Sequence, residues 1–177
     1  GAAGGETPAQ AVDEGAATAL EAAHAAGARG DLAGIYDHII DNRGERLAAA
    51  VLALAAPGAL PALVHCSAGK DRTGLVIALV LDLAGVPTDV IAEDFALTAR
   101  YLDGEAGAAV RRLSAHMSPD GAELPESVMA CPPELIVRSL ERVRSRHGDS
   151  RGYLLAHGTT PHALDRLVDA LVQPVDL

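Results

Sequence analysis

Aromatic side chains are scarce in this 177-residue chain, which has no Trp, one Phe and three Tyr. The hydrophobic fraction is nevertheless 49%, so the core has to be built from Ala, Leu and Val. A chain of this length suits one domain and is long enough to bury such a core. The composition therefore predicts a single domain with an aliphatic interior.

Basic residues are also in short supply, with 14 Lys and Arg against 24 Asp and Glu, for a net charge of −10. Nonspecific nucleic-acid binding needs a basic surface, so the charge balance argues against that class of partner. An anion that binds to this chain must be attracted by local groups, against an unfavourable overall field.

Cysteines are few and long apolar runs are missing. Two cysteines, Cys66 and Cys131, do not make a disulfide framework, and we expect Cys131 to be an apolar filler or a loop thiol. The sequence contains no apolar run of roughly eighteen residues that would span a membrane, and no signal-peptide pattern. Because the chain begins with Gly1, we expect the native N-terminus to lie upstream. Localisation, cytoplasmic or secreted, and oligomeric state stay open.

Apolar periodicity predicts a mainly helical chain after a Gly- and Ala-rich segment, residues 1–30, that we expect to be flexible or weakly helical. One strand is predicted, from Leu60 to His65. The residues after it are apolar nearly all round a helix, which predicts burial at the domain centre. Thr88 and Thr160 are expected to cap helices. The predicted helices cover 31–56, 73–83, 88–102, 105–116, 132–147, 151–156 and a last helix that begins at Thr160-Pro161.

The chemistry lies in one stretch, Leu60 to Gly74, which reads LPALVHCSAGKDRTG. An apolar strand is followed by a loop that contains Gly69, and a helix then begins. Successive N–H groups of such a loop can point at one centre, and the helix N-terminus adds positive potential. The order of these elements predicts an anion-binding site.

Each residue type in the loop suits a phosphate. Cys66 meets the loop N–H groups and the helix dipole, so its pKa should fall and its thiolate could attack phosphorus. Arg72 can bind two phosphate oxygens with its planar fork. Gly69 permits the backbone to curl, and Thr73 can donate to the sulfur. Gly74 lets the first helical turn pack closely. The bland alternative is that Cys66 is a small buried hydrophobe at a strand end.

Residues His65 to Gly74 resemble the phosphate-binding loop of the cysteine-dependent protein tyrosine phosphatase superfamily, whose pattern is His-Cys-five residues-Arg-Ser/Thr-Gly. The fuller string AGKDRTG resembles a bacterial branch of secreted mycobacterial type, which is also similar to phosphoinositide phosphatases. The resemblance implies an α/β fold with a central parallel sheet wrapped by helices. Since only one strand is found here, we expect a mostly helical chain that lacks the N-terminal strands. Residues 31–177 would be the C-terminal part of the phosphatase domain, with lid-like helices from Thr88 to Met117.

The implied activity is phosphomonoester hydrolysis through a phosphocysteine, on phosphotyrosine proteins, on a dual-specificity range or on phosphoinositides. Cys66 would be the nucleophile, and Arg72 with the loop residues Ser67, Ala68, Gly69, Lys70 and Thr73 would hold the phosphate. We expect no metal or cofactor. His65 more plausibly holds the loop backbone than transfers a proton, and Gly74 supports the loop.

Two loop residues have open roles. Asp71 is either the general acid, because a carboxyl beside a phosphate dianion holds its proton more tightly, or part of an ion pair that shapes the loop. Lys70 is either a determinant of selectivity for multiply phosphorylated substrates or a solvated lysine.

Three alternatives from other classes are weighed against this hypothesis. The loop could belong to a phosphate- or phosphoprotein-binding module with little or no turnover. It could belong to another cysteine enzyme, such as a sulfur transferase or an arsenate reductase, although those do not typically combine His65 with Arg72-Thr73-Gly74. A purely structural helical protein is disfavoured by the density of the motif.

Overall fold

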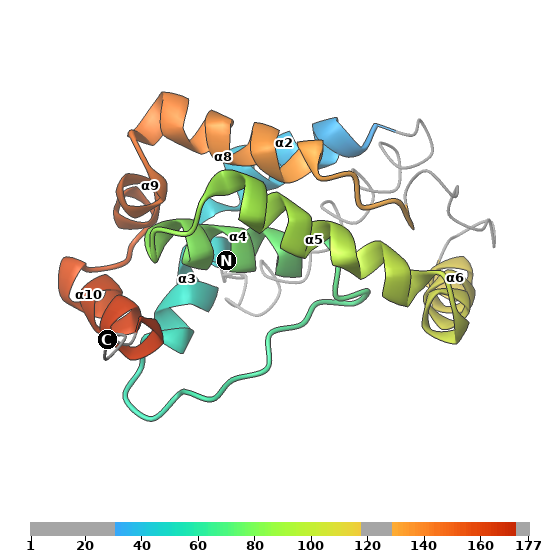
Figure 1. Cartoon of the computed structure of the whole chain (residues 1–177), viewed down its shortest axis with the longest axis horizontal. Helices are drawn as coiled ribbons and strands as arrows, with labels where there is room; N and C mark the ends of the chain where they lie inside the picture. The colour runs from blue at the N-terminus through green and yellow to red at the C-terminus, as the bar shows by residue number, and fades with distance from the viewer. Residues whose placement is uncertain (1–30, 118–128, 173–177) are drawn as a thin grey trace, which may run out of the picture.

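The computed structural model describes residues 31–117 and 129–172, so the prediction for residues 1–30 lies outside the described residues. The described part is built from helices that pack around one hydrophobic core (Figure 1). In none of these helices is there an apolar stretch long enough to cross a bilayer. The helices are α2 (Leu32–Asn42), α3 (Gly44–Leu54), α4 (Asp71–Leu83), α5 (Thr88–Leu102), α6 (Glu105–Met117), α8 (Glu134–His147), α9 (Ser150–Ala156) and α10 (Pro161–Leu171).

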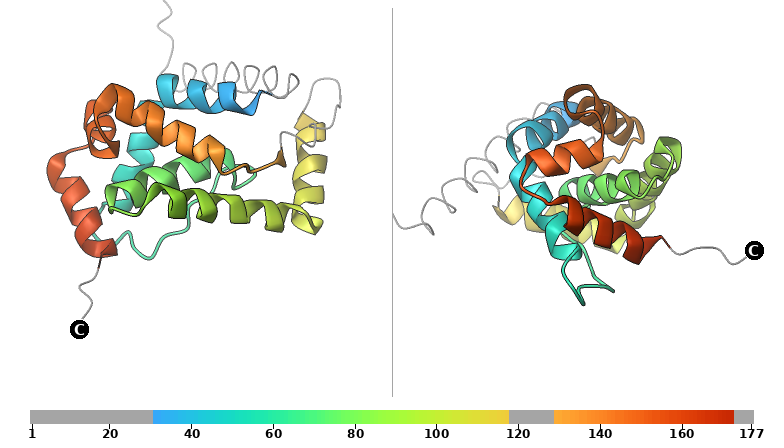
Figure 2. Two further views of the ribbon diagram at one scale, coloured as in Figure 1. Left: turned by 45° about the horizontal axis from the view of Figure 1, so that its top comes forward. Right: turned by 90° about the vertical axis from the view of Figure 1, so that its left-hand side faces the viewer.

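Helix α4 lies at the centre of this arrangement, as its nearly all-round apolar sequence predicts. It packs against α3, α5, α8 and α9, and the two views in Figure 2 show these helices around it. Leu75, Val76, Leu79 and Val80 of α4 are buried. Helix α4, which follows the loop at residues 66–70, is therefore held on several sides, and its first turn has a fixed position.

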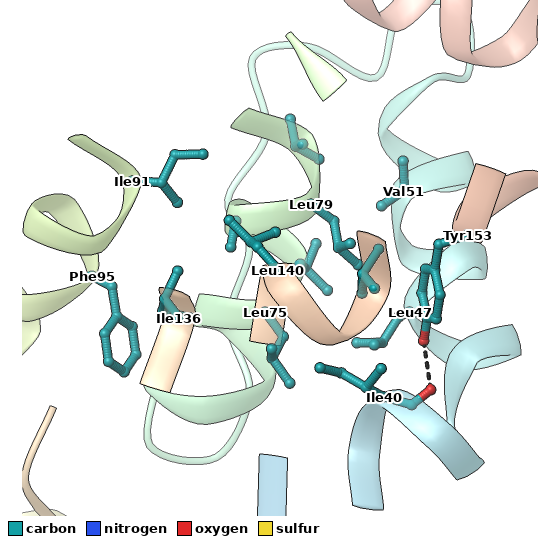
Figure 3. Packing of buried hydrophobic residues seen from close by; sticks show 14 of the residues in the cluster. Ile40, Leu47, Val51, Leu75, Leu79, Ile91, Phe95, Ile136, Leu140 and Tyr153 are labelled. Atoms are coloured by element: carbon teal, nitrogen blue, oxygen red, sulfur yellow. Dashed lines mark hydrogen bonds between the residues drawn. The ribbon is translucent and has the colours of Figure 1, made fainter. Parts of the chain in front are cut away.

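Aliphatic side chains fill the space between the central helices, as the shortage of aromatics predicts. Leu79 of α4, Leu140 of α8 and Val51 of α3 are all buried in one cluster (Figure 3). The Tyr153 hydroxyl of α9 donates a 2.8 Å hydrogen bond to the Ile40 carbonyl of α2. A buried tyrosine hydroxyl normally needs such a partner, and this one ties the two ends of the described chain together.

Ion pairs fasten α8 to α2 across the surface. Arg138 donates to Asp37 at 2.6 Å, and both Arg142 and Arg146 bind Asp41. The opposite face of α8 is turned to the core, because Leu135, Ile136, Leu140 and Val143 are buried. The arginines on the outer face of α8 are thus partnered by the acidic residues of α2.

The predicted strand from Leu60 to His65 is wrong. These residues form part of a long connection between α3 and α4, drawn as a tube along the lower edge of Figure 1. The Leu63 side chain is 88% exposed. A strand is defined by hydrogen bonds to a neighbouring strand, and the described residues contain no second strand. The described residues are accordingly all helical, and the expected parallel sheet is not seen among them.

Several helix boundaries differ from the predictions, those of α6, α8 and α9 by only one or two residues. The helix expected over 31–56 is two helices, with a break at Arg43 where Gly44 packs so closely on His157 that a β-carbon would lie 2.3 Å from its ring. Helix α4 begins at Asp71 and not at Thr73. Thr88 does not cap α5; its hydroxyl instead accepts a 2.9 Å hydrogen bond from Arg144. Thr160 caps α10 as predicted, by accepting from the Ala163 N–H.

Candidate active site

The loop that the sequence predicts to bind phosphate, called the phosphate loop below, runs from Cys66 to Lys70 and leads directly into α4. Gly69 has a φ of +67°, a left-handed conformation that glycine adopts without steric cost. The Gly74 N–H donates to the Lys70 carbonyl at 2.6 Å, which closes the first turn of α4. The first N–H groups of a helix have no partner within the helix, and here the N–H groups of Lys70 and Thr73 act on the Cys66 sulfur.

Side chains at both ends of the loop hold it together. The Arg72 guanidinium donates to the Ser67 hydroxyl at 3.1 Å. The Nδ1 atom of His65 donates to the Cys66 carbonyl at 3.1 Å. These contacts bring His65, Cys66, Ser67 and Arg72 together, and the His65 contact is of the backbone-holding kind that the sequence suggests.

The Cys66 thiol is half-buried, and opposing effects act on it. Burial raises its pKa, but the hydroxyl and the N–H of Thr73, the N–H of Lys70 and the charge of Arg72 lower it more, so that the net pKa is lowered. Hydrogen bonds to sulfur and nearby positive charge favour the thiolate over the thiol. Near neutral pH, a larger fraction of Cys66 is therefore present as the nucleophilic thiolate than in an ordinary cysteine.

Lys70 and Asp71 form a pair that points into the protein. The Lys70 ammonium lies 2.7 Å from Asp71 Oδ1 and donates to the Ala130 carbonyl at 3.1 Å. Lys70 is 2% exposed, whereas the Asp71 side chain is 28% exposed. The lysine is thus not solvated, and it links the phosphate loop to a segment 60 residues further along the chain.

Gly74 is in close contact with Phe95 of α5. A β-carbon at Gly74 would lie 2.8 Å from two atoms of the Phe95 ring, which is well inside van der Waals contact. The ring of Phe95 is 5% exposed and meets the ring of Tyr36 edge-on, with centroids 6.2 Å apart. The predicted supporting role of Gly74 thus corresponds to a specific helix–helix contact.

A hollow of about 360 Å³ opens beside the loop, between α4 and α5. Gly69 and Thr73 form its loop end, and Phe95, Leu97 and Tyr101 of α5 line its wall. Tyr101 is 76% exposed, so the hollow is open to solvent. Of the helices predicted to be lid-like, α5 lines the hollow directly. Helix α6 packs on α5.

Residues outside the motif also approach the site. Cys131 is buried, and burial raises the pKa of its thiol, while the nearby Lys70 charge lowers it and Asp71 raises it. Tyr36 of α2 lies close enough to Asp71 for the charge of Asp71 to act on it. No motif in the sequence points to Tyr36, and its only signal there is the shortage of aromatics. The part of the chain that the structure describes contains no cluster of three His, Cys, Asp or Glu side chains suited to a metal ion.

Comparison with known proteins agrees with this geometry. A model of the tyrosine phosphatase family matches residues 6–173. The triple specificity protein phosphatase PtpB of Mycobacterium tuberculosis is 30% identical over 144 residues, which are 74% of this chain and 50% of PtpB. A tyrosine-protein phosphatase of Nostoc commune is 56% identical over 43 residues, 24% of this chain and 15% of that protein.

This chain spans at most about half the length of these two curated relatives. The match to the family model, in contrast, extends over nearly the whole chain and includes the complete loop from His65 to Gly74. The chain therefore belongs to the tyrosine phosphatase family.

Proposed function

We propose that this chain hydrolyses phosphomonoesters through a phosphocysteine at Cys66, as a protein tyrosine phosphatase. The observation that supports the proposal most directly is the lowered pKa of the Cys66 thiol inside a loop of N–H groups closed by Arg72. A thiolate in such a loop is a nucleophile that lies next to the phosphate group that the loop would bind.

In the first step the Cys66 sulfur attacks phosphorus, and the bond from phosphorus to the leaving oxygen breaks. Arg72 and the N–H groups of Ser67, Ala68 and Gly69 hold the equatorial oxygens, where charge stabilisation matters most. Asp71 gives a proton to the leaving oxygen. In the second step water attacks phosphorus, the sulfur leaves, and Asp71 takes up a proton, so phosphate is released and the thiolate restored.

The substrates we propose are phosphotyrosine proteins, a dual-specificity range of phosphoproteins, or phosphoinositides. The name of the mycobacterial relative describes a triple specificity protein phosphatase. The open, largely apolar hollow beside Gly69 and Thr73 offers room for the organic part of the substrate. Because Lys70 is buried against Asp71, we propose that it acts on the substrate through its charge within the loop.

The test is hydrolysis of a phosphotyrosine peptide and of phosphatidylinositol monophosphates by the full chain, with Cys66→Ser alongside. We expect turnover that Cys66→Ser abolishes. Asp71→Asn should keep phosphate binding and lose roughly 10²-fold or more in rate on a poor leaving group.

The alternative is a phosphate-binding module. Inorganic phosphate or vanadate bound by the intact thiol, with no hydrolysis of either substrate, would contradict the proposed activity and favour that module.

A further inference from the structure

The hydroxyl of Tyr36, in the core near the start of α4, is buried without a hydrogen-bond partner among the described residues. Tyr36 is 1% exposed, yet its hydroxyl is not hydrogen-bonded to any of the residues that the structure describes. Tyr153 is equally buried, and its hydroxyl donates to the Ile40 carbonyl at 2.8 Å. Buried hydroxyls in proteins almost always have a partner, so the orientation of the Tyr36 hydroxyl calls for a reason.

Ring contacts place Tyr36 beside the first turn of α4. Its ring meets Phe95 edge-on at 6.2 Å, and Phe95 in turn lies against Gly74 of α4. Asp71 begins the same turn. Tyr36 is held by this row of contacts, and its hydroxyl has little freedom to turn elsewhere.

Asp71 offers an acceptor near this hydroxyl, because its Oδ1 atom is also buried without a hydrogen bond. Burial raises the pKa of Tyr36, and the charge of the nearby Asp71 raises it further. The hydroxyl therefore keeps its proton and acts as a donor. Asp71 Oδ1 is buried and lies 2.7 Å from the Lys70 ammonium. The carboxyl thus lies near two buried groups, the Lys70 ammonium of the loop and the Tyr36 hydroxyl of α2.

We propose that Tyr36 is a positioning residue whose hydroxyl donates to the Asp71 carboxyl and, with Lys70, sets the direction in which Asp71 meets the leaving oxygen. The inference deepens the proposed function, because it rests on Asp71 as the proton donor. Tyr36 lies outside the motif, on a helix that precedes the loop by some 30 residues of sequence. It would thus control the orientation of Asp71 from a distant position in the chain.

The test is Tyr36→Phe in the full chain, which removes the hydroxyl and leaves the ring against Phe95. We expect kcat/KM for phenyl phosphate, a poor leaving group, to fall roughly 5- to 10-fold, a part of the full general-acid effect. For p-nitrophenyl phosphate, which needs no proton to leave, the change should stay within about 2-fold. Tyr153→Phe is the matched control: it removes a hydroxyl that is hydrogen-bonded elsewhere, so it should lower stability and affect the two substrates equally.

A double-mutant cycle decides whether the effect passes through Asp71. In an Asp71→Asn background, Tyr36→Phe should produce no further selective loss on phenyl phosphate, because the group that it positions is gone. Equal loss on both substrates, or the same selective loss in both backgrounds, would overturn the proposal.

The same cycle measured by urea unfolding keeps the inference separate from the proposed activity. Contact between the two side chains predicts that their effects on the folding equilibrium are coupled by roughly 3-fold or more. Additive effects would reject the contact even if the chain has no turnover. Coupling in a chain without turnover would retain the Tyr36–Asp71 contact while the proposed catalysis fails, and would overturn the positioning role.

Discussion

The contact between Gly74 and Phe95 makes the substitution Gly74→Ala a sensitive probe of how the phosphate loop is held. The new β-carbon would lie 2.8 Å from two atoms of the Phe95 ring. The ring is 5% exposed and flanked by Tyr36, so it has little room to move aside. Alanine would raise helix propensity by up to about 1 kcal/mol, but overpacking of this kind costs about 1–3 kcal/mol.

Because the ring is confined, we expect an overpacking cost in the upper part of that range, about 2–3 kcal/mol. The gain in helix propensity offsets up to about 1 kcal/mol of it. Gly74→Ala should therefore lower the free energy of unfolding by about 1–2 kcal/mol. Arg72 and Thr73 belong to the same helical turn, so kcat/KM should fall as well. Urea unfolding followed by far-UV circular dichroism measures the stability, because the chain has no Trp to report on it.

Gly104→Ala is the matched control, because a β-carbon there would meet nothing within 4 Å. Its effect should stay within about 0.5 kcal/mol. Shortening the opposing side chain should rescue the variant, so Gly74→Ala with Phe95→Leu should be more stable than the sum of the single changes predicts. A Gly74→Ala protein as stable and as active as the wild type would refute the reasoning.

Two further substitutions test the electrostatics of the site and of the fold. Thr73→Val removes the hydroxyl that lowers the pKa of Cys66, so the midpoint of iodoacetamide alkylation against pH should move to higher pH; an unchanged midpoint would show that the hydroxyl does not act on the thiol. Asp41→Asn removes the partner of Arg142 and Arg146. Hydrogen bonding to Arg142, despite partial burial, holds the pKa of Asp41 below its ordinary 3.8. A group with a lowered folded-state pKa stabilises above its unfolded-state pKa. The melting temperature of Asp41→Asn should therefore lie below that of the wild type at pH 7, and the difference should shrink as the pH falls below 3.8; a difference that is independent of pH would contradict the ion pair.

Much of the site could be predicted from the sequence because its geometry is local. The loop, Gly69 in a left-handed conformation and the helix start that follows are set by backbone preferences within ten residues. The lowered pKa of Cys66 follows from the same short segment, since Thr73, Lys70 and Arg72 all lie within it. The resemblance to tyrosine phosphatases, which depends on these residues, is confirmed by the family match.

Predictions that needed a partner elsewhere in the chain were less successful. The segment from Leu60 to His65 has the composition of a strand, but strand formation depends on a neighbouring strand, and none is present in the ranges that the structure describes. The role of Thr88 was also decided at a distance, because Arg144 of α8 takes its hydroxyl away from the helix end.

The sequence by itself determined the glycine-containing loop before α4, the aliphatic core and the central position of α4, because motif spacing and apolar periodicity are properties of neighbouring residues. Only the tertiary structure decided that Lys70 is buried against Ala130, that Phe95 fills the space at Gly74 and that Tyr36 is buried against Phe95. These contacts join residues far apart in the chain. Their geometry depends on how whole helices pack. That packing is decided by contacts throughout the core, which a local sequence pattern does not specify.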